Sequence, residues 1–312
     1  LPNSLGERPR LQKLALAGNR LKSLPLTLAK ASNLELIRIS ANQLAECPEH
    51  LLNLPKLAWL AFSGNPFSTI NKTINAEVSA NSVPEISSTS YTLKQVLGQG
   101  ASGVISQAVW NTPQSKFPDD IAVKVFKGEV TSDGYPQDEL QACLQVGVHP
   151  NLVQSLAQVN EADQLALVMN LIPSHYKNLG LPPCLKSCTR DTFPHGFTLS
   201  IKQISKIVNQ MTEVFEHMHN KQVSHGDLYA HNTLFDDTMT DNNANIIFGD
   251  FGAASMFHML NQNQQTQIQK IERRALNYFI QDLLNVCIEK DKTSIQYRLL
   301  TERLNYNNSL QE

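Results

Sequence analysis

Residues 224–232, SHGDLYAHN, place a carboxylate and a carboxamide five positions apart. Asp227 could accept a proton from a hydroxyl, and Asn232 offers an oxygen of the kind that Mg²⁺ binds. A second carboxylate, Asp250, follows at the end of NIIFGD, and the run NTLFD begins at Asn232. These two runs predict a hairpin that brings both metal-ligand candidates together. The pattern indicates a phosphate-transfer site; the alternative is a polar loop, since Asp, Asn and Gly are ordinary turn residues.

A glycine-rich stretch offers a second phosphate contact. Residues 98–105, GQGASGVI, fit G-x-G-x-x-G-x-V with isoleucine in the last place. Glycines let the backbone approach phosphates closely, with amide N–H groups facing the anion. A dinucleotide-binding fold would need a helix next, but the residues that follow have the character of a strand, so that alternative is disfavoured.

A lysine follows the glycine-rich stretch on an apolar run. Lys124 ends the sequence IAVK, where a charged group among β-forming residues needs a partner. Glu139, on the helix predicted over 136–146, is the candidate. The alternative is an ordinary lysine at the end of a strand.

The elements that would position these residues change type along the chain. Strand-like runs cover 91–110, 119–128, 152–160 and 164–172. The strongest helical pattern runs from Ser200 to Gln222, with apolar residues at three- and four-residue steps and a capping box formed by Ser200 and Gln203. A small β-rich lobe followed by a helical lobe predicts an α+β fold.

The first 70 residues repeat with a period of 23, as Leu14, Ile37 and Leu60 show. Each unit reads L-x-x-L-x-L-x-x-N-x-L, which resembles the leucine-rich repeat. The alternating apolar residues predict short strands, and the asparagine can satisfy backbone groups where the chain turns. The chain opens inside a repeat, so we expect further repeats before Leu1. Residues 71–90, rich in Ser, Asn and Thr, are interpreted as a linker or an outer strand.

Residues 91–290 resemble a eukaryotic-type protein kinase domain. The resemblance rests on six motifs in order: the glycine loop, AVK, the helix glutamate Glu139, HPNLV (149–153), HGDLYAHN and GDFG (249–252). The combination with the repeats is similar to leucine-rich-repeat protein kinases, including bacterial ones. It implies a two-lobed kinase-like fold behind a short solenoid, with repeats over 1–70, a linker over 71–90, an N-lobe over 91–172 and a compact C-lobe over 173–312.

The resemblance also implies roles for individual residues. Lys124 would hold the α- and β-phosphates of ATP and pair with Glu139, while Asp227 would accept or orient the substrate hydroxyl. Asn232 and Asp250 would bind Mg²⁺. Met169 would be the gatekeeper and residues 170–172 the hinge that pairs with adenine. The full set implied to contact ATP is Gly98, Gly100, Ser102, Gly103, Ile105, Ala122, Lys124, Met169, Asn170 and Ile172.

Three positions depart from the family pattern. Gly226 stands where many protein kinases have an arginine that meets a phosphate on the activation segment, which suggests a kinase not switched on by activation-loop phosphorylation. Tyr229 replaces the lysine that serine/threonine kinases place near the transferring phosphate. His231 replaces the arginine of tyrosine kinases and would supply positive charge only when protonated. The residues that distinguish serine/threonine from tyrosine kinases are thus both absent, and between the two we favour serine or threonine as the acceptor.

The segment between Asp250 and Ile271 contains NQNQQTQIQ and no A-P-E. We interpret this polar stretch as a mobile activation segment or substrate platform, with a helix opening near Ile271. The helical lobe is then shorter than in the family.

Composition narrows the class of protein. The 312 residues carry a net charge of −2, with 17% charged residues, which gives no reason to expect nucleic-acid binding. No apolar run reaches the roughly 18 residues that span a bilayer. Five scattered cysteines fit a reducing compartment, so we expect a cytoplasmic protein or an effector delivered to a host. Cys184, Cys188 and His195 lack a fourth ligand at zinc spacing, which disfavours a metal site.

Three functions remain to be distinguished. The complete motif set favours an ATP-dependent protein kinase whose repeats recruit a protein partner or substrate. The spelling H-G-D-x-x-x-x-N also occurs in aminoglycoside and choline phosphotransferases, which act on small molecules. A pseudokinase or scaffold that only binds nucleotide is the third possibility.

Overall fold

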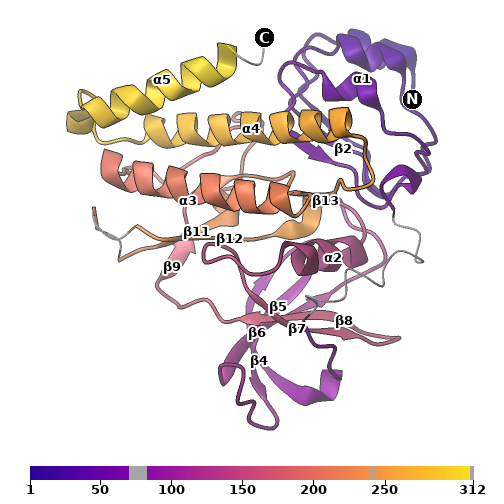
Figure 1. Ribbon diagram of the computed structural model, residues 1–312, viewed down its shortest axis with the longest axis vertical. Coiled ribbons are helices and arrows are strands. Elements are labelled where there is room, and N and C mark those ends of the chain that lie inside the picture. The colour runs from indigo at the N-terminus through magenta and orange to yellow at the C-terminus, as the bar shows by residue number, and fades with distance from the viewer. Residues whose placement is uncertain (70–82, 239, 242–243, 310–312) are drawn as a thin grey trace.

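The computed structural model describes residues 1–69, 83–238, 240–241 and 244–309. Figure 1 shows a β-rich lobe at one end, a layer of helices at the other, and the first 69 residues beside those helices. We call residues 1–69 the repeat region. Residues 71–82 of the predicted linker, and Ile70 before them, lie outside the described residues.

Stacked units of 23 residues build the repeat region. Strands β1 (Lys13–Ala15), β2 (Leu36–Arg38) and β3 (Trp59–Ala61) lie parallel, and the register pairs Lys13 with Leu36 and Leu36 with Trp59, one period at a time. The short helix α1 (Glu49–Leu52) and 3₁₀ turns at Asn3–Glu7 and Leu26–Lys30 complete the units.

The asparagines of these units satisfy the backbone where the chain turns, as predicted. Asn42 donates from Nδ2 to the carbonyl of Ile39 at 3.0 Å and accepts from the amide of Leu21 at 3.1 Å. Asn65 repeats the pattern one period later, accepting from the amide of Leu44 at 3.2 Å. Buried polar groups paired in this way cost little, so the tight turns can stack.

The β-rich lobe is an antiparallel sheet in the order β4-β5-β6-β8-β7. Its strands are β4 (Tyr91–Gln99), β5 (Gly103–Trp110), β6 (Asp120–Phe126), β7 (Ser155–Asn160) and β8 (Leu165–Asn170). Helix α2 (Pro136–Val146) contacts β8. The end of the predicted linker pairs with the sheet edge, where the amide of Ile86 donates to the carbonyl of Gln158 at 2.9 Å.

The second lobe centres on α3 (Ile201–Asn220), whose apolar stripe is buried and whose predicted capping box between Ser200 and Gln203 is present. It packs against α4 (Gln262–Asn285) and α5 (Ile295–Ser309). Strands β9 (Tyr176–Asn178), β11 (Thr233–Asp236) and β12 (Ile246–Phe248) form a small sheet, and β10 (Val223–Ser224) pairs with β13 (Ser255–Met256).

The interpretation of NQNQQTQIQ as a mobile segment is wrong, while the substrate platform stays a prediction. Helix α4 begins at Gln262, nine residues before the predicted start, because Asn261 and Gln264 form a capping box. Glutamine is a good helix former, so two polar turns extend the helix without an apolar stripe to reveal them.

The repeat region and the helical lobe share a hydrophobic core. Phe257, Leu260, Ile268 and Ile271 are buried together with the leucines of the repeats. Trp59 of β3 is buried on the other side, within the core built around α3. The repeat region is therefore packed into the second lobe and not tethered to it by a linker alone. Among the described helices, none combines the length and apolarity needed to cross a membrane.

Candidate active site

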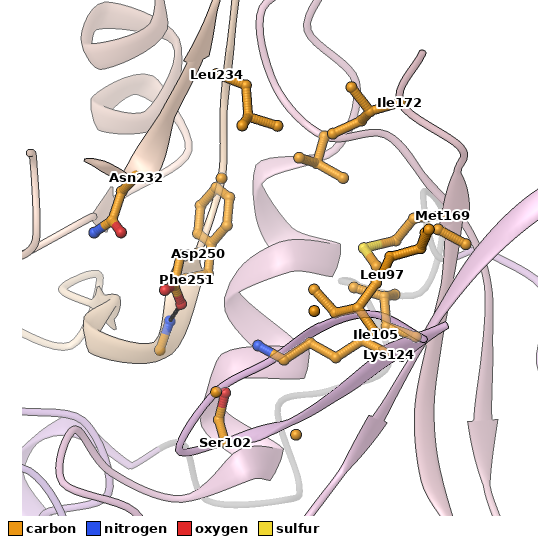
Figure 2. A pocket seen from close by; sticks show the side chains of 18 of the residues that line it. Leu97, Ser102, Ile105, Lys124, Met169, Ile172, Asn232, Leu234, Asp250 and Phe251 are labelled. Atoms are coloured by element: carbon orange, nitrogen blue, oxygen red, sulfur yellow. Dashed lines mark hydrogen bonds between the residues drawn. The ribbon is translucent and has the colours of Figure 1, made fainter. Parts of the chain in front are cut away.

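A cleft of about 800 Å³ lies between the β-rich lobe and the helical lobe. Leu97, Ile105 and Met169 line it from the sheet, and Asn232 and Asp250 line it from the other lobe, as Figure 2 shows. The walls combine apolar side chains with a few polar groups, which is the usual construction of a small-molecule site.

Lys124 and Glu139 form a buried ion pair at the back of this cleft. Burial alone would lower the pKa of Lys124, but the nearby Glu139 and Asp250 carboxylates raise it above the usual lysine value. The ammonium therefore stays charged. The partner expected for Lys124 is present, and Lys124 and Glu139 both line the cleft.

The glycine loop covers the cleft with open backbone at Gly98 and Gly100, where an added Cβ would contact nothing within 4 Å. Gly103 differs, because a Cβ there would lie 2.5 Å from the carbonyl oxygen of Val125 on the neighbouring strand. The first two glycines are thus free to admit a ligand close to the backbone, whereas the third permits β5 and β6 to pair.

The 224–232 loop holds Asp227 and Asn232 in contact. Asn232 donates from Nδ2 to Asp227 Oδ2 at 2.8 Å and to the Asp227 carbonyl at 3.0 Å. Because its nitrogen is used in this way, the amide oxygen of Asn232 is the atom that can meet a cation. Asp250 has φ of 60°, and its side chain accepts from the amide of Gly252 at 3.4 Å.

Asn232 and Asp250 both line the cleft, and Figure 2 shows the Asn232 oxygen turned toward the Asp250 side. An amide oxygen and a carboxylate are hard oxygen donors, which fit Mg²⁺ with water and phosphate oxygens completing its shell. Among the described residues no group of three or more His, Cys, Asp or Glu side chains could hold a metal by itself. Asn232 and Asp250 alone offer two oxygen donors in the cleft, which fit a cation that takes its other ligands from water and phosphate.

His225 and Glu272 support the loop from below, and the motifs did not identify either role. Glu272 of α4 accepts from the amides of His225 at 2.9 Å and Gly226 at 2.8 Å. Burial lowers the pKa of His225, so the ring is neutral; its Nε2 lies 3.0 Å from the Gly249 carbonyl and its Nδ1 accepts from the Asp227 amide at 3.3 Å. This network links the Asp227 loop to the Asp250 loop.

Arg38 reaches the 224–232 loop from strand β2 of the repeat region and belongs to none of the kinase motifs. Its Nη2 pairs with Asp227 Oδ1, its Nη1 donates to the Gly226 carbonyl at 2.6 Å, and its Nε donates to Asp133 at 3.0 Å. Burial alone would lower the pKa of Arg38, but the Asp227 and Asp133 carboxylates outweigh burial and raise the pKa above its usual value. The guanidinium therefore remains charged. Arg38 occupies a variable position of its repeat, where the other two units have Ala15 and Ala61, and its charge at that position is the only signal in the sequence.

The environments of Tyr229 and His231, the two other unusual residues of the loop, do not favour a catalytic role for either. Tyr229 is buried and stacks on Trp59, with ring centroids 5.0 Å apart. His231 lines the cleft, but burial lowers its pKa. His231 is therefore less able than an ordinary histidine to carry the positive charge of the arginine that it replaces.

The structure brings most residues implied to contact ATP to the cleft. Asn170 is not among those that line it, since its side chain donates to Gln154 at 2.7 Å, and Leu171 lines the cleft in its place. Asp227 lies beside the cleft with 23% of its side chain exposed. The predicted site residues that line the cleft are Gly98, Gly100, Ser102, Gly103, Ile105, Ala122, Lys124, Glu139, Met169, Ile172, Asn232 and Asp250.

A buried Lys–Glu pair, an open glycine loop and an Asp–Asn loop around one cleft define a phosphotransferase of the two-lobed class. The family model for the protein kinase domain matches residues 91–292, and the chain belongs to this family. No curated protein matches the chain.

Proposed function

We propose that this chain is an active ATP- and Mg²⁺-dependent protein kinase that phosphorylates serine or threonine. The observation that carries the proposal is the formed Lys124–Glu139 pair, opposite Asn232 and Asp250 in one cleft. A pseudokinase that kept only nucleotide binding would not need Asp227 held by Asn232 beside that cleft. The protein kinase family match favours a protein acceptor over an aminoglycoside or choline.

The chain's own residues then divide the reaction between them. Lys124 orients the phosphates of ATP. The hydroxyl oxygen of the acceptor bonds to the γ-phosphorus, and Asp227 accepts the proton that this hydroxyl releases. The bond from that phosphorus to the bridging oxygen breaks, and its electron pair leaves on ADP. Mg²⁺ held by Asn232 and Asp250 supplies charge neutralisation when bound.

Serine or threonine is favoured over tyrosine by the charges around the loop. His231, at the position of the tyrosine-kinase arginine, has a lowered pKa and no charge at neutral pH. A cation does contact Asp227, but it comes from Arg38. We further propose that residues 1–70 are leucine-rich repeats that recruit a protein substrate or partner, which their stacked units and their position beside Asp227 support.

Transfer from radiolabelled ATP tests this function. With Mg²⁺, the wild-type chain should label itself or a generic protein, and phosphoamino-acid analysis should recover phosphoserine or phosphothreonine. Asp250→Ala should reduce labelling by at least about 10³-fold, since charge neutralisation at the phosphates is a large part of catalysis. Equal labelling by both proteins would indicate a pseudokinase or scaffold. Labelling of aminoglycosides or choline alone would indicate a small-molecule phosphotransferase.

A further inference from the structure

We propose that Arg38 of the repeat region is a positioning residue of the active site, where its guanidinium orients Asp227 and ties the 224–232 loop to the loop that precedes α2. The inference rests on the proposed kinase function. It assigns to the repeats a part in catalysis in addition to recruitment.

The contacts of Arg38 fix its guanidinium in one orientation. It is 5% exposed and uses three nitrogens on three partners from two other parts of the chain: Asp227, Gly226 and Asp133. A planar guanidinium with several bonded donors has little rotational freedom, so it determines the direction of the carboxylate that it binds. Asn232 holds the second carboxylate oxygen, Oδ2, at 2.8 Å. Asp227 is thus oriented from both sides, while 23% of its side chain stays exposed.

The other anchor of Arg38, Asp133, lies in the loop that leads into α2, the helix that carries Glu139. The same loop is pressed against the repeats. A Cβ on Gly134 would lie 2.9 Å from Ser63 Oγ, and one on Gly64 would lie 2.6 Å from the ring of Tyr135. Arg38 therefore connects Asp227 with the base of the helix whose glutamate pairs with Lys124.

A contact on Asp227 could also be inhibitory, but an inhibitory element must be able to leave. Trp59 is 2% exposed, stacks on Tyr229, and donates from Nε1 to the Leu228 carbonyl at 2.9 Å. Phe257 and Ile271 of the second lobe lie in one core with the leucines of the repeats. Withdrawal of the repeats would expose all of these buried side chains to water, which is unfavourable for each large apolar group. The packing therefore indicates that the repeat region is a permanent component of the site and not a removable inhibitor.

The test compares the wild-type chain with Arg38→Gln and Arg38→Lys, and uses Arg20→Ala, an exposed arginine of the same region, as the matched control. Four quantities are measured: kcat for transfer to a generic protein, KM for ATP, the melting temperature, and hydrogen exchange of the amides of residues 226–229.

Arg38→Gln should lower kcat by about 10²-fold, the typical effect of misplacing a catalytic group. KM for ATP should stay within about threefold, because Arg38 does not line the nucleotide cleft. Arg38→Lys keeps the charge but cannot bond three partners in one plane, so its kcat should be intermediate. Amides 226–229 should exchange faster in Arg38→Gln, and Arg20→Ala should match the wild type.

A kcat in Arg38→Gln that equals or exceeds the wild-type value would overturn the proposal, and an increase would identify the contact as inhibitory. If Arg38→Gln does not fold, Arg38→Lys decides: wild-type kcat from this variant would equally overturn it. Absence of transfer by the wild type itself would defeat the kinase function. Hydrogen exchange would then still decide whether Arg38 positions the loop, because unchanged exchange at 226–229 contradicts that role.

Discussion

The 224–232 loop shows at the residue scale how two departures from the family pattern follow from one contact. Gly226 has φ of 70°, and an added Cβ would lie 2.7 Å from the Leu60 carbonyl oxygen and 2.8 Å from that of Ala253. Tyr229, three residues on, stacks on Trp59 of the same strand as Leu60. A long side chain at 226 and a solvated lysine at 229 are both incompatible with β3 in this place. The unusual residues therefore reflect docking of the repeats.

Gly226→Ala should destabilise the protein by about 3 kcal/mol or more, because left-handed backbone strain adds to a collision with two carbonyl oxygens. Gly196→Ala is the matched control, since Gly196 also has positive φ, 78°, but open space around its Cβ. It should cost only about 1 kcal/mol. Urea denaturation of both variants measures the difference, and equal losses would show that Leu60 and Ala253 do not constrain the loop.

At the element scale, sequence patterns predicted those elements whose signals are local. The strands of the β-rich lobe and the capped helix α3 follow from short-range alternation and three- to four-residue steps, and they were predicted. The start of α4 was missed because its first six residues, QNQQTQ, are all polar and form no apolar stripe. Lys124 and Glu139 are only 15 positions apart in an expected strand–helix unit, whereas Arg38 and Asp227 are separated by 189 positions. No local pattern encodes a pairing over that distance, since it depends on how the repeats pack.

The segment between β9 and α3 carries a pH-sensitive contact to the 224–232 loop. Asp191 accepts from the amide of Ala230 at 2.8 Å. Burial, with a further contribution from Asp282, raises the pKa of Asp191 to about 7, although the Ala230 hydrogen bond lowers it. The folded protein thus binds this proton more tightly than the unfolded chain, whose aspartates titrate near 3.9.

This contribution to stability is complete below about pH 4 and is lost as the pH rises through about 7. Asp191→Asn keeps an acceptor for Ala230 but cannot ionise, so its free energy of unfolding should depend less on pH between 4 and 7. At pH 8 the variant should be more stable than the wild type. Chemical denaturation across this range measures both curves, and parallel curves would refute the assignment to Asp191.

At the scale of the whole molecule, the repeat region packs against the 224–232 loop. Only residues 253–261 lie between the GDFG stretch and α4. Residues 253–261 contain one hydroxyl side chain, Ser255. It is fully buried and accepts from the amides of Phe62 at 2.9 Å and Ser63 at 3.1 Å on the repeat region. In place of a segment ordered by phosphate, this part of the chain is ordered by a backbone contact with the repeats.

Treatment with a broad-specificity phosphatase should therefore leave kcat within about twofold of the untreated value, since no exposed hydroxyl in this segment is available to carry an activating charge.

Ser255→Ala should retain activity per folded molecule while losing about 1–3 kcal/mol of stability, because two buried amides lose their acceptor. Ser255→Asp should not activate the enzyme and should disrupt the interface, since a carboxylate would be buried between β3 and β13. A large loss of activity after phosphatase treatment, restored by Mg-ATP before substrate is added, would contradict this account. It would place the regulatory phosphate at a position outside residues 253–261.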